Sequence, residues 1–186
     1  MRRGLTTFLV VVIVIVGLVA WGASAYNRLV TLGERVDAQW GQVENQLMRR
    51  FDLIPALVQA AEAYAAHEKE VFARVSDARA KLAGAQSVEE KVGAANELQE
   101  ALSRLLVVVE AYPDLKASDV YRQYMDAVEG TENRLATERM RFNELVRDFN
   151  VAIKRFPALL YARALGFVER EYVKAPPGAE TAPTGK

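Results

Sequence analysis

A run of uncharged residues near the amino terminus limits what this chain can fold into more than any other feature. The run extends from Leu5 to Ala25, consists mostly of Val, Ile and Leu, and follows Arg2 and Arg3. As an α-helix with a rise of about 1.5 Å per residue it extends roughly 31 Å. This length is close to the ~30 Å hydrocarbon thickness of a bilayer. The sequence therefore predicts a single transmembrane helix, with the lipid bilayer as the partner of residues 5–25.

The flanks of this run indicate how it is processed and oriented. Trp21 and Tyr26 lie at its far end, where interfacial aromatic residues are common. Ala23-Ser24-Ala25 resembles a cleavage site, so a cleaved signal peptide is the competing interpretation, although the run exceeds the usual apolar core of ~7–15 residues. Arg2 and Arg3 outweigh the basic residues of the other flank, which favours an amino terminus inside the cell and a domain outside it.

Composition narrows the classes of function open to the 186-residue chain. Lys plus Arg and Asp plus Glu number 24 each, so the chain lacks the basic surplus of a nucleic-acid binder. It has no cysteine and a single histidine, His67, which excludes disulfides, thiol nucleophiles and Cys-rich zinc sites. Phosphate-binding glycine loops and nucleophile elbows are missing from the sequence as well. We therefore expect no enzymatic activity, no cofactor, no metal site and no nucleic-acid partner.

The region after Tyr26 has apolar residues at heptad-like spacing and no convincing strand alternation. This pattern predicts an all-α fold, an antiparallel up-and-down bundle of about four long helices. We expect the first helix to continue out of the membrane as far as Pro55, which either kinks it or begins a second helix. The expected second helix carries apolar residues from Ile54 to Leu82 and ends at Gly84.

The remaining helices are delimited by local signals. Ser87 and Glu90 have the spacing of a capping box, which predicts a third helix that continues to Val109. The simplest interpretation of Tyr112-Pro113-Asp114 is a helix stop. The functional alternative is an exposed recognition loop. Ser118 or Asp119 then caps a long fourth helix.

The carboxyl-terminal part completes the predicted domain organisation. Ala158–Tyr172 is expected to form a short final amphipathic segment, and the Pro-, Gly- and Thr-rich residues 175–186 a disordered tail. The predicted divisions are an anchor over 1–25, a helical bundle over 26–174 and the tail over 175–186.

Charged and amide side chains interrupt the apolar faces of these helices. Arg49, Arg50 and Asp52 lie within an apolar run, and Glu68 lies on the apolar face of the expected second helix. A charge inside a bundle costs several kcal/mol unless it is paired, so we expect these groups to meet in a network that fixes helix register or in a functional cleft. The candidates for such a network, or for a partner surface, are Arg49, Arg50, Asp52, Glu68, Tyr112, Asp114, Glu132, Asn133, Arg134, Arg139, Asn143 and Asn150.

Five motifs in a fixed order, with three shorter matches after them, give the chain a family resemblance. They are Tyr26–Val30, Gln46–Val58, Tyr64–Glu68, Ala111–Lys116 and Thr131–Leu135, followed by Arg141–Asn143, Asn150 and Phe156–Pro157. In these motifs the chain resembles the LemA family over nearly everything between Ala25 and Tyr172. Two positions depart from the family pattern: Ala56 stands where Asn is usual, and Phe142 stands where Tyr is usual and so lacks a hydroxyl.

The resemblance implies a bacterial, membrane-anchored helical bundle and brings no reaction or cofactor with it. We expect an interaction or scaffold protein of the bacterial envelope, located in the cytoplasmic (inner) membrane with its bundle on the outer, periplasmic side. Its expected partner is another membrane or envelope protein, or further copies of itself. One alternative is a lipid- or small-ligand-sensing module in which Ala158–Tyr172 lies on the bilayer. The other is a metal-binding or enzymatic bundle that uses Glu62, His67, Glu68 and Glu132.

Overall fold

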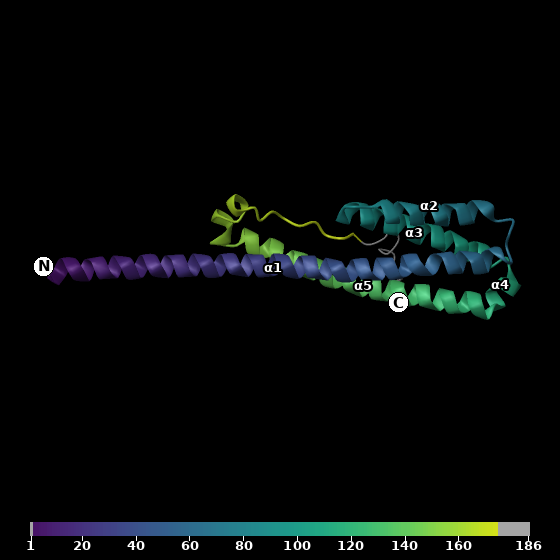
Figure 1. The fold of residues 1–186 in the computed structure, drawn as a ribbon, viewed down its shortest axis with the longest axis horizontal. Coiled ribbons are helices and arrows are strands. Elements are labelled where there is room, and N and C mark those ends of the chain that lie inside the picture. Colours follow the sequence, from purple (N-terminus) through teal and green to yellow (C-terminus); the bar gives the residue numbers. More distant parts are fainter. Residues whose placement is uncertain (1, 175–186) are drawn as a thin grey trace, which may run out of the picture. The chain divides into compact units, whose positions relative to one another are not determined.

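The computed structural model describes residues 2–174, and at positions 2, 3 and 5–7 it describes the backbone alone. No strand occurs within residues 2–174, which confirms the predicted all-α class. The predicted disordered tail over 175–186 lies outside the described residues. The elements, shown in Figure 1, are α1 (Arg2–Glu62), α2 (Lys69–Gly84), α3 (Val88–Val109), α4 (Pro113–Ala117), α5 (Asp119–Lys154) and the 3₁₀ turns η1 (Ala158–Leu160) and η2 (Arg163–Leu165).

The described residues form two compact units, and α1 and α5 each contribute to both. The first unit comprises the chain up to Trp40 together with Arg141–Tyr172. The second unit comprises Gly41–Met140 together with the stretch that begins at Val173. The anchor and bundle boundaries predicted at residues 25 and 26 stay a prediction.

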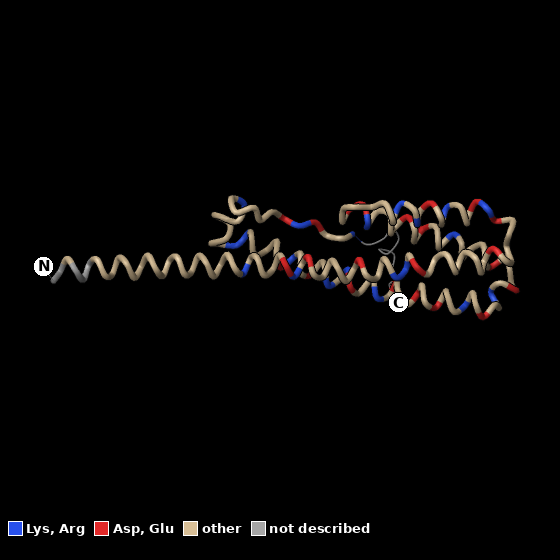
Figure 2. Tube along the Cα trace, in the orientation of Figure 1, with Lys and Arg blue, Asp and Glu red and all other residues tan. Residues whose placement is uncertain are grey.

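The first unit begins with the uncharged part of α1. Its large apolar side chains from Phe8 to Trp21 are exposed, and Figure 2 shows this part of the helix without acidic or basic residues. Within residues 2–174, α1 is the one helix that is long and apolar enough to cross a membrane, judged by length and composition. This finding is consistent with single-pass membrane anchoring.

The rest of the first unit is built from α1, α5 and the segment that follows α5. Phe142 of α5 packs edge-on against Trp40 of α1, with ring centroids 5.5 Å apart. After α5 the chain turns through η1 and η2 and reaches Gly166, whose φ of 84° is left-handed and therefore suits glycine. Buried apolar side chains in this unit include Leu29, Val36, Val146, Phe149 and Ile153.

The second unit is a four-helix arrangement in which consecutive long helices alternate in direction (Figure 1), as predicted. It contains the carboxyl-terminal part of α1, all of α2 and α3, and the amino-terminal part of α5. The predicted capping box is present: Ser87 Oγ accepts from the Glu90 amide at 3.1 Å, and Glu90 Oε2 accepts from the Ser87 amide at 3.1 Å. The core of this unit includes Val43, Ile54, Leu57, Val75, Leu98, Leu105, Leu115 and Leu135.

The expectation that the second helix extends from Ile54 to Leu82 is wrong, because α1 continues through Pro55 to Glu62. Proline lacks the amide that would donate to the carbonyl of Phe51, four residues earlier. The guanidinium of Arg79 on α2 supplies a donor instead: its Nε lies 3.2 Å from that carbonyl oxygen. The same guanidinium lies 3.7 Å from the centroid of the Phe51 ring. A tertiary contact therefore satisfies the backbone group that Pro55 leaves free.

The reversal between the first two helices lies at residues 63–68, where the sequence has neither glycine nor proline. The carbonyl of Ala61 accepts from the amides of Tyr64 and Ala65, which closes α1 in a tight turn. Packing explains this position: Ala61 and Ala65 are buried within the turn, and α2 then buries Phe72 and Val75. Tertiary packing overrides local helix propensity here.

The segment expected to be the last amphipathic piece, Ala158–Tyr172, contains the two 3₁₀ turns η1 and η2 and then, from Phe167, chain without helix or strand. The helix stop expected at Tyr112-Pro113-Asp114 follows the end of α3 at Val109, and the single-turn helix α4 begins there with Pro113 at its first position. A proline is well tolerated there because the first helical amides have no partner within the helix.

Candidate functional site

The centre of the second unit contains a buried arginine. Arg50 of α1 is 3% exposed and donates through Nη1 to Oε2 of Glu132 on α5 and through Nη2 to Oε1 of Gln99 on α3. Three helices thus meet at one guanidinium. The planar fork of arginine suits this geometry because it presents several donors in fixed directions.

The electrostatics of this cluster are unbalanced. Burial lowers the pKa of Arg50; the charge of Glu132 and its hydrogen bond oppose this shift, and the positive charge of Arg139 adds to it. Arg139 is itself 7% exposed, and burial lowers its pKa as well, again opposed by Glu132. Two largely buried guanidinium groups therefore depend on one carboxylate, with Gln99 as a neutral acceptor. We call Arg50, Gln99, Glu132 and Arg139 the arginine cluster.

Several polar atoms, in the arginine cluster and one helical turn away from it along α1 and α3, are buried without a hydrogen-bond partner among the described residues. They include Nε of Arg50 and Nε of Arg139 as donors. The acceptors are Oε1 of Gln46, one helical turn before Arg50 on α1, and Oδ1 of Asn96, one turn before Gln99 on α3. Buried polar groups of this kind usually bind an internal water.

A second polar contact lies between two more of the predicted candidates. The hydroxyl of Tyr112 donates to Oε1 of Glu68 at 3.0 Å and links the turn after α3 to the turn before α2. This hydrogen bond, together with burial and the negative charge of Glu68, raises the pKa of Tyr112. The contact brings two candidates from separate turns together.

A third contact lies in the first unit and uses Asn150. This side chain is 5% exposed, donates through Nδ2 to the carbonyl of Arg170 at 2.8 Å and accepts the Arg170 amide at Oδ1, at 2.9 Å. The guanidinium of Arg170 in turn pairs with Asp37 of α1 at 3.1 Å. Asn150 therefore joins the segment around Arg170 to α5, because its side chain forms hydrogen bonds with both the carbonyl and the amide of Arg170.

The remaining candidates divide by exposure. Asn143 is half-buried in the first unit. The structure brings Arg50, Glu132 and Arg139 together and pairs Glu68 with Tyr112. The other candidates are exposed rather than part of the arginine cluster, namely Arg49, Asp52, Asp114, Asn133 and Arg134.

Sequence reasoning missed four residues that cross-link helices. Gln99 completes the arginine cluster, Glu44 of α1 pairs with Lys91 of α3, and Arg79 serves the Phe51 carbonyl. Gln99 follows the buried Leu98 on α3, and an amide beside an apolar face is a weak signal that could have identified it. For Glu44, Lys91 and Arg79 no signal is present, because charged residues on helix flanks are usually solvated.

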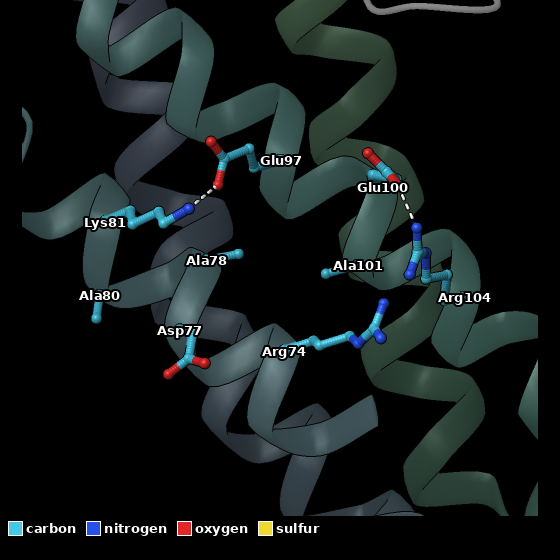
Figure 3. Close-up of a pocket in the computed structure, with 9 residues that line it drawn as sticks. All are labelled: Arg74, Asp77, Ala78, Ala80, Lys81, Glu97, Glu100, Ala101 and Arg104. Atoms are coloured by element: carbon cyan, nitrogen blue, oxygen red, sulfur yellow. Dashed lines mark hydrogen bonds and ion pairs between the residues drawn. The ribbon is translucent and has the colours of Figure 1, made fainter. Parts of the chain in front are cut away.

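A groove lies between α2 and α3 (Figure 3). Ala78 of α2 and Ala101 of α3 point into it, and charged side chains surround them. Two pairs of the rim are satisfied within the protein: Lys81 with Glu97 at 2.5 Å and Arg104 with Glu100 at 2.6 Å. The groove is lined by Arg74, Asp77, Ala78, Ala80, Lys81, Glu97, Glu100, Ala101 and Arg104.

A metal site needs several His, Cys, Asp or Glu side chains close together, so their arrangement is relevant to the metal-binding alternative. Across the described part of the chain, no group of three or more His, Cys, Asp or Glu residues lies close enough to hold a metal ion. Glu68 faces Tyr112 and Glu132 faces Arg50.

Comparisons with known proteins agree with the architecture. The model of the LemA family matches residues 39–185. The magnetosome protein MamQ of Magnetospirillum gryphiswaldense is 29% identical over 182 residues, which cover 84% of this chain and 67% of that protein. Magnetosome proteins MamQ 1 and MamQ 2 of Paramagnetospirillum magneticum are each 27% identical over 199 aligned residues, covering 91% of this chain and 72% of theirs. Because the family match extends over most of the chain, the predicted resemblance is confirmed, and the chain belongs to the LemA family.

Proposed function

We propose that this protein is a membrane-anchored scaffold without catalytic activity, which binds another membrane or envelope protein or further copies of itself. The observation that carries this proposal is the continuity of α1, which runs from the uncharged segment to Glu62 without a break. A chain that has an exposed apolar helix in one unit and a helical bundle in the other is suited to tether a binding surface to a membrane.

The polar interior supports a structural role for the buried candidates. Arg50 and Glu132 bind each other, and Asn150 binds a backbone. Catalytic sites usually combine perturbed titratable groups with an accessible cleft, whereas the arginines with perturbed pKa values here are buried between the helices of the second unit. The relatives carry names that refer to the magnetosome and to no reaction.

The exposed candidates are the proposed partner-facing residues. Arg49 and Asp52 lie on α1, Asp114 on α4, and Asn133 and Arg134 on α5. Exposed charged residues on helices steer association and fix the register of a complex. A contact that depends on them would weaken as salt increases, since screening shortens the range of surface charges.

We further propose that the anchor lies in the cytoplasmic (inner) membrane of a bacterium with the bundle on the periplasmic side. The natural chain has no cysteine, so a Gln86→Cys variant, in the exposed turn between α2 and α3, provides a unique label site. Intact cells are treated with a membrane-impermeant maleimide. The expected result is labelling of membrane-bound protein in intact cells. Labelling only after lysis would contradict the proposed orientation. Release of protein that lacks residues 1–25 would contradict the proposed anchoring.

The scaffold role itself is tested by cross-linking in cells. A photoreactive amino acid is placed at Arg49 or at Arg134, with Glu89 as the control because it is also exposed and lies on α3. The expected result is a discrete cross-linked species from Arg49 or Arg134 and none from Glu89, with a dimer band if the partner is a second copy. Equal background from all three positions would contradict the proposed surface.

A further inference from the structure

The segment after α5 places small residues inside and large apolar residues outside. Ala158 and Ala162 are buried, at 7% and 3% exposure. The large side chains of the same segment are exposed: Phe156 at 76%, Leu159 at 62%, Leu160 at 73%, Leu165 at 52% and Val168 at 62%. A segment that only completed a core would show the reverse order, because large aliphatic and aromatic side chains gain most from burial. We call residues 155–168 the apolar loop.

Contacts within the first unit place the apolar loop at the end of the uncharged run. The ring of Phe167 packs edge-on against Tyr26, with centroids 5.7 Å apart. Tyr26 is the residue that follows Ala25, where the uncharged run ends. Figure 1 shows the yellow-green segment that follows α5 beside this part of α1. The apolar loop therefore lies where α1 would leave a bilayer.

Further contacts fix the two ends of the apolar loop. Lys154, just before it, pairs with Glu169, just after it, at 2.7 Å. Phe149 of α5 packs against Phe167 with ring centroids 6.4 Å apart, and Asn150 holds Arg170. These contacts join the two ends of the apolar loop to each other and to α5, so the backbone that carries its exposed side chains is fixed at both ends.

The charge of the apolar loop also has one sign. Residues 155–168 include Arg155 and Arg163, both exposed, and no acidic residue. Exposed apolar side chains combined with arginines are typical of segments that lie in the interface of a membrane, where the arginine heads reach phosphate groups.

We propose that the apolar loop inserts Phe156, Leu159 and Leu160 into the boundary between headgroups and acyl chains of the leaflet from which α1 emerges. Arg155 and Arg163 then contact the phosphates of anionic lipids. This inference rests on the proposed anchoring by residues 5–25. It assigns the molecule a second membrane contact, separate from the span and formed by the opposite end of the sequence.

The bilayer is favoured over a protein as the cover for this surface because of its position. The contact between Tyr26 and Phe167 ties the loop to the end of the span, so whatever holds the span lies next to the loop. A protein partner would have to occupy the same level as the headgroups.

The test uses the full chain reconstituted in vesicles of phosphatidylcholine with phosphatidylglycerol. A Leu160→Cys variant carries an environment-sensitive fluorophore, and quenching is measured with a lipid-borne nitroxide and with aqueous acrylamide. Val14→Cys, in the uncharged run, reports on the anchor, and Gln86→Cys serves as the control outside the first unit. Leu160 is exposed, so its replacement leaves the packing intact.

The expected result is nitroxide quenching and a blue-shifted emission at positions 160 and 14, and acrylamide quenching alone at position 86. Quenching at position 14 with an unquenched position 160 would overturn the inference and leave the anchor intact. Protection of position 160 from acrylamide without nitroxide quenching would also overturn it, because a protein or a second copy would then cover the loop. No nitroxide quenching at position 14 would overturn the anchor and the inference with it.

The contribution of the arginines is tested in the same label background. Arg155→Gln with Arg163→Gln is expected to reduce nitroxide quenching at position 160 in vesicles that contain phosphatidylglycerol, and to change it little in phosphatidylcholine alone. Equal quenching of the variant and its parent in both vesicles would overturn the proposed contact with anionic lipid.

Discussion

Arg50 and Glu132 are 82 residues apart in the chain and form an ion pair whose two partners differ in burial. The arginine side chain is 3% exposed, whereas the glutamate side chain retains 29%. Removing the carboxylate leaves a guanidinium that is secluded from bulk solvent, while removing the guanidinium leaves a carboxylate that bulk solvent can still reach. The two halves of one ion pair therefore contribute unequally to the stability of the bundle.

We expect Glu132→Ala to lower the free energy of unfolding by about 3–5 kcal/mol, as for buried pairs that lose one partner. Arg50→Met, which keeps an aliphatic stem of similar length, should cost clearly less. Urea unfolding of the full chain in mild detergent, followed by circular dichroism, measures both values. Arg49→Ala is the matched control, since this exposed neighbour should change stability by no more than about 0.5 kcal/mol. Equal losses for Glu132→Ala and Arg50→Met would contradict the asymmetry.

The contact between Arg79 and the Phe51 carbonyl should depend on Pro55. In the natural chain, Arg79→Met removes a hydrogen bond and a cation–π contact and should cost roughly 1–2 kcal/mol. In a Pro55→Ala background, alanine supplies the missing amide to the Phe51 carbonyl, so the same replacement should cost less. The double-mutant cycle gives the coupling free energy from four unfolding curves. A coupling of zero would mean that Arg79 does not compensate for the proline.

Asn150→Ala should release the segment around Arg170 from α5. The replacement removes both hydrogen bonds to the Arg170 backbone, leaving those groups to find water. We expect faster tryptic cleavage after Arg170 and a loss of stability of about 1–3 kcal/mol, the usual penalty for unpaired buried groups. Asp148→Ala, an exposed neighbour on α5, provides the control. If cleavage after Arg170 proceeds equally fast in both variants, the segment is held by other contacts.

The hydrogen bond between Tyr112 and Glu68 should stabilise the fold only while the phenol is protonated. Because the pKa of Tyr112 is raised in the folded state, its contribution is complete below the unfolded value of about 10 and is lost as the pH rises through the folded value. The stability difference between the natural chain and Tyr112→Phe should therefore be constant near neutral pH and shrink in strong alkali. Unfolding curves collected across this range measure it, with Tyr64→Phe as the exposed control. A stability difference between the two proteins that grows as the pH rises would contradict this prediction.

The helical class, the apolar span and the capping box could be predicted because each depends on residues that are near in sequence. Ser87 and Glu90 are three positions apart, and the run from Leu5 to Ala25 is continuous. The expected break at Pro55 failed because the group that rescues the helix is Arg79, which reaches Phe51 only after α2 has folded back. Local rules cannot include a donor supplied by tertiary structure.

The polar candidates show the same division. That buried charges would pair was predictable from the cost of leaving them alone, and Arg50 does pair with Glu132. Which of Arg49 and Arg50 points inward depends on a rotation of about 100° per residue around the helix, which apolar spacing did not resolve. Ala158–Tyr172 was expected to be a short amphipathic segment, but its composition did not reveal that the small side chains of Ala158 and Ala162 are the buried ones.

The continuity of α1 has a mechanical consequence for the proposed membrane anchoring. The helix has no break between the uncharged run and Trp40, so we expect this part of the first unit to tilt together with the span. A helix whose apolar length exceeds the hydrocarbon thickness tilts to hide the excess. Thinning of the membrane would then tilt the first unit by the same angle as the span, so the orientation of its surface would depend on the thickness of the bilayer.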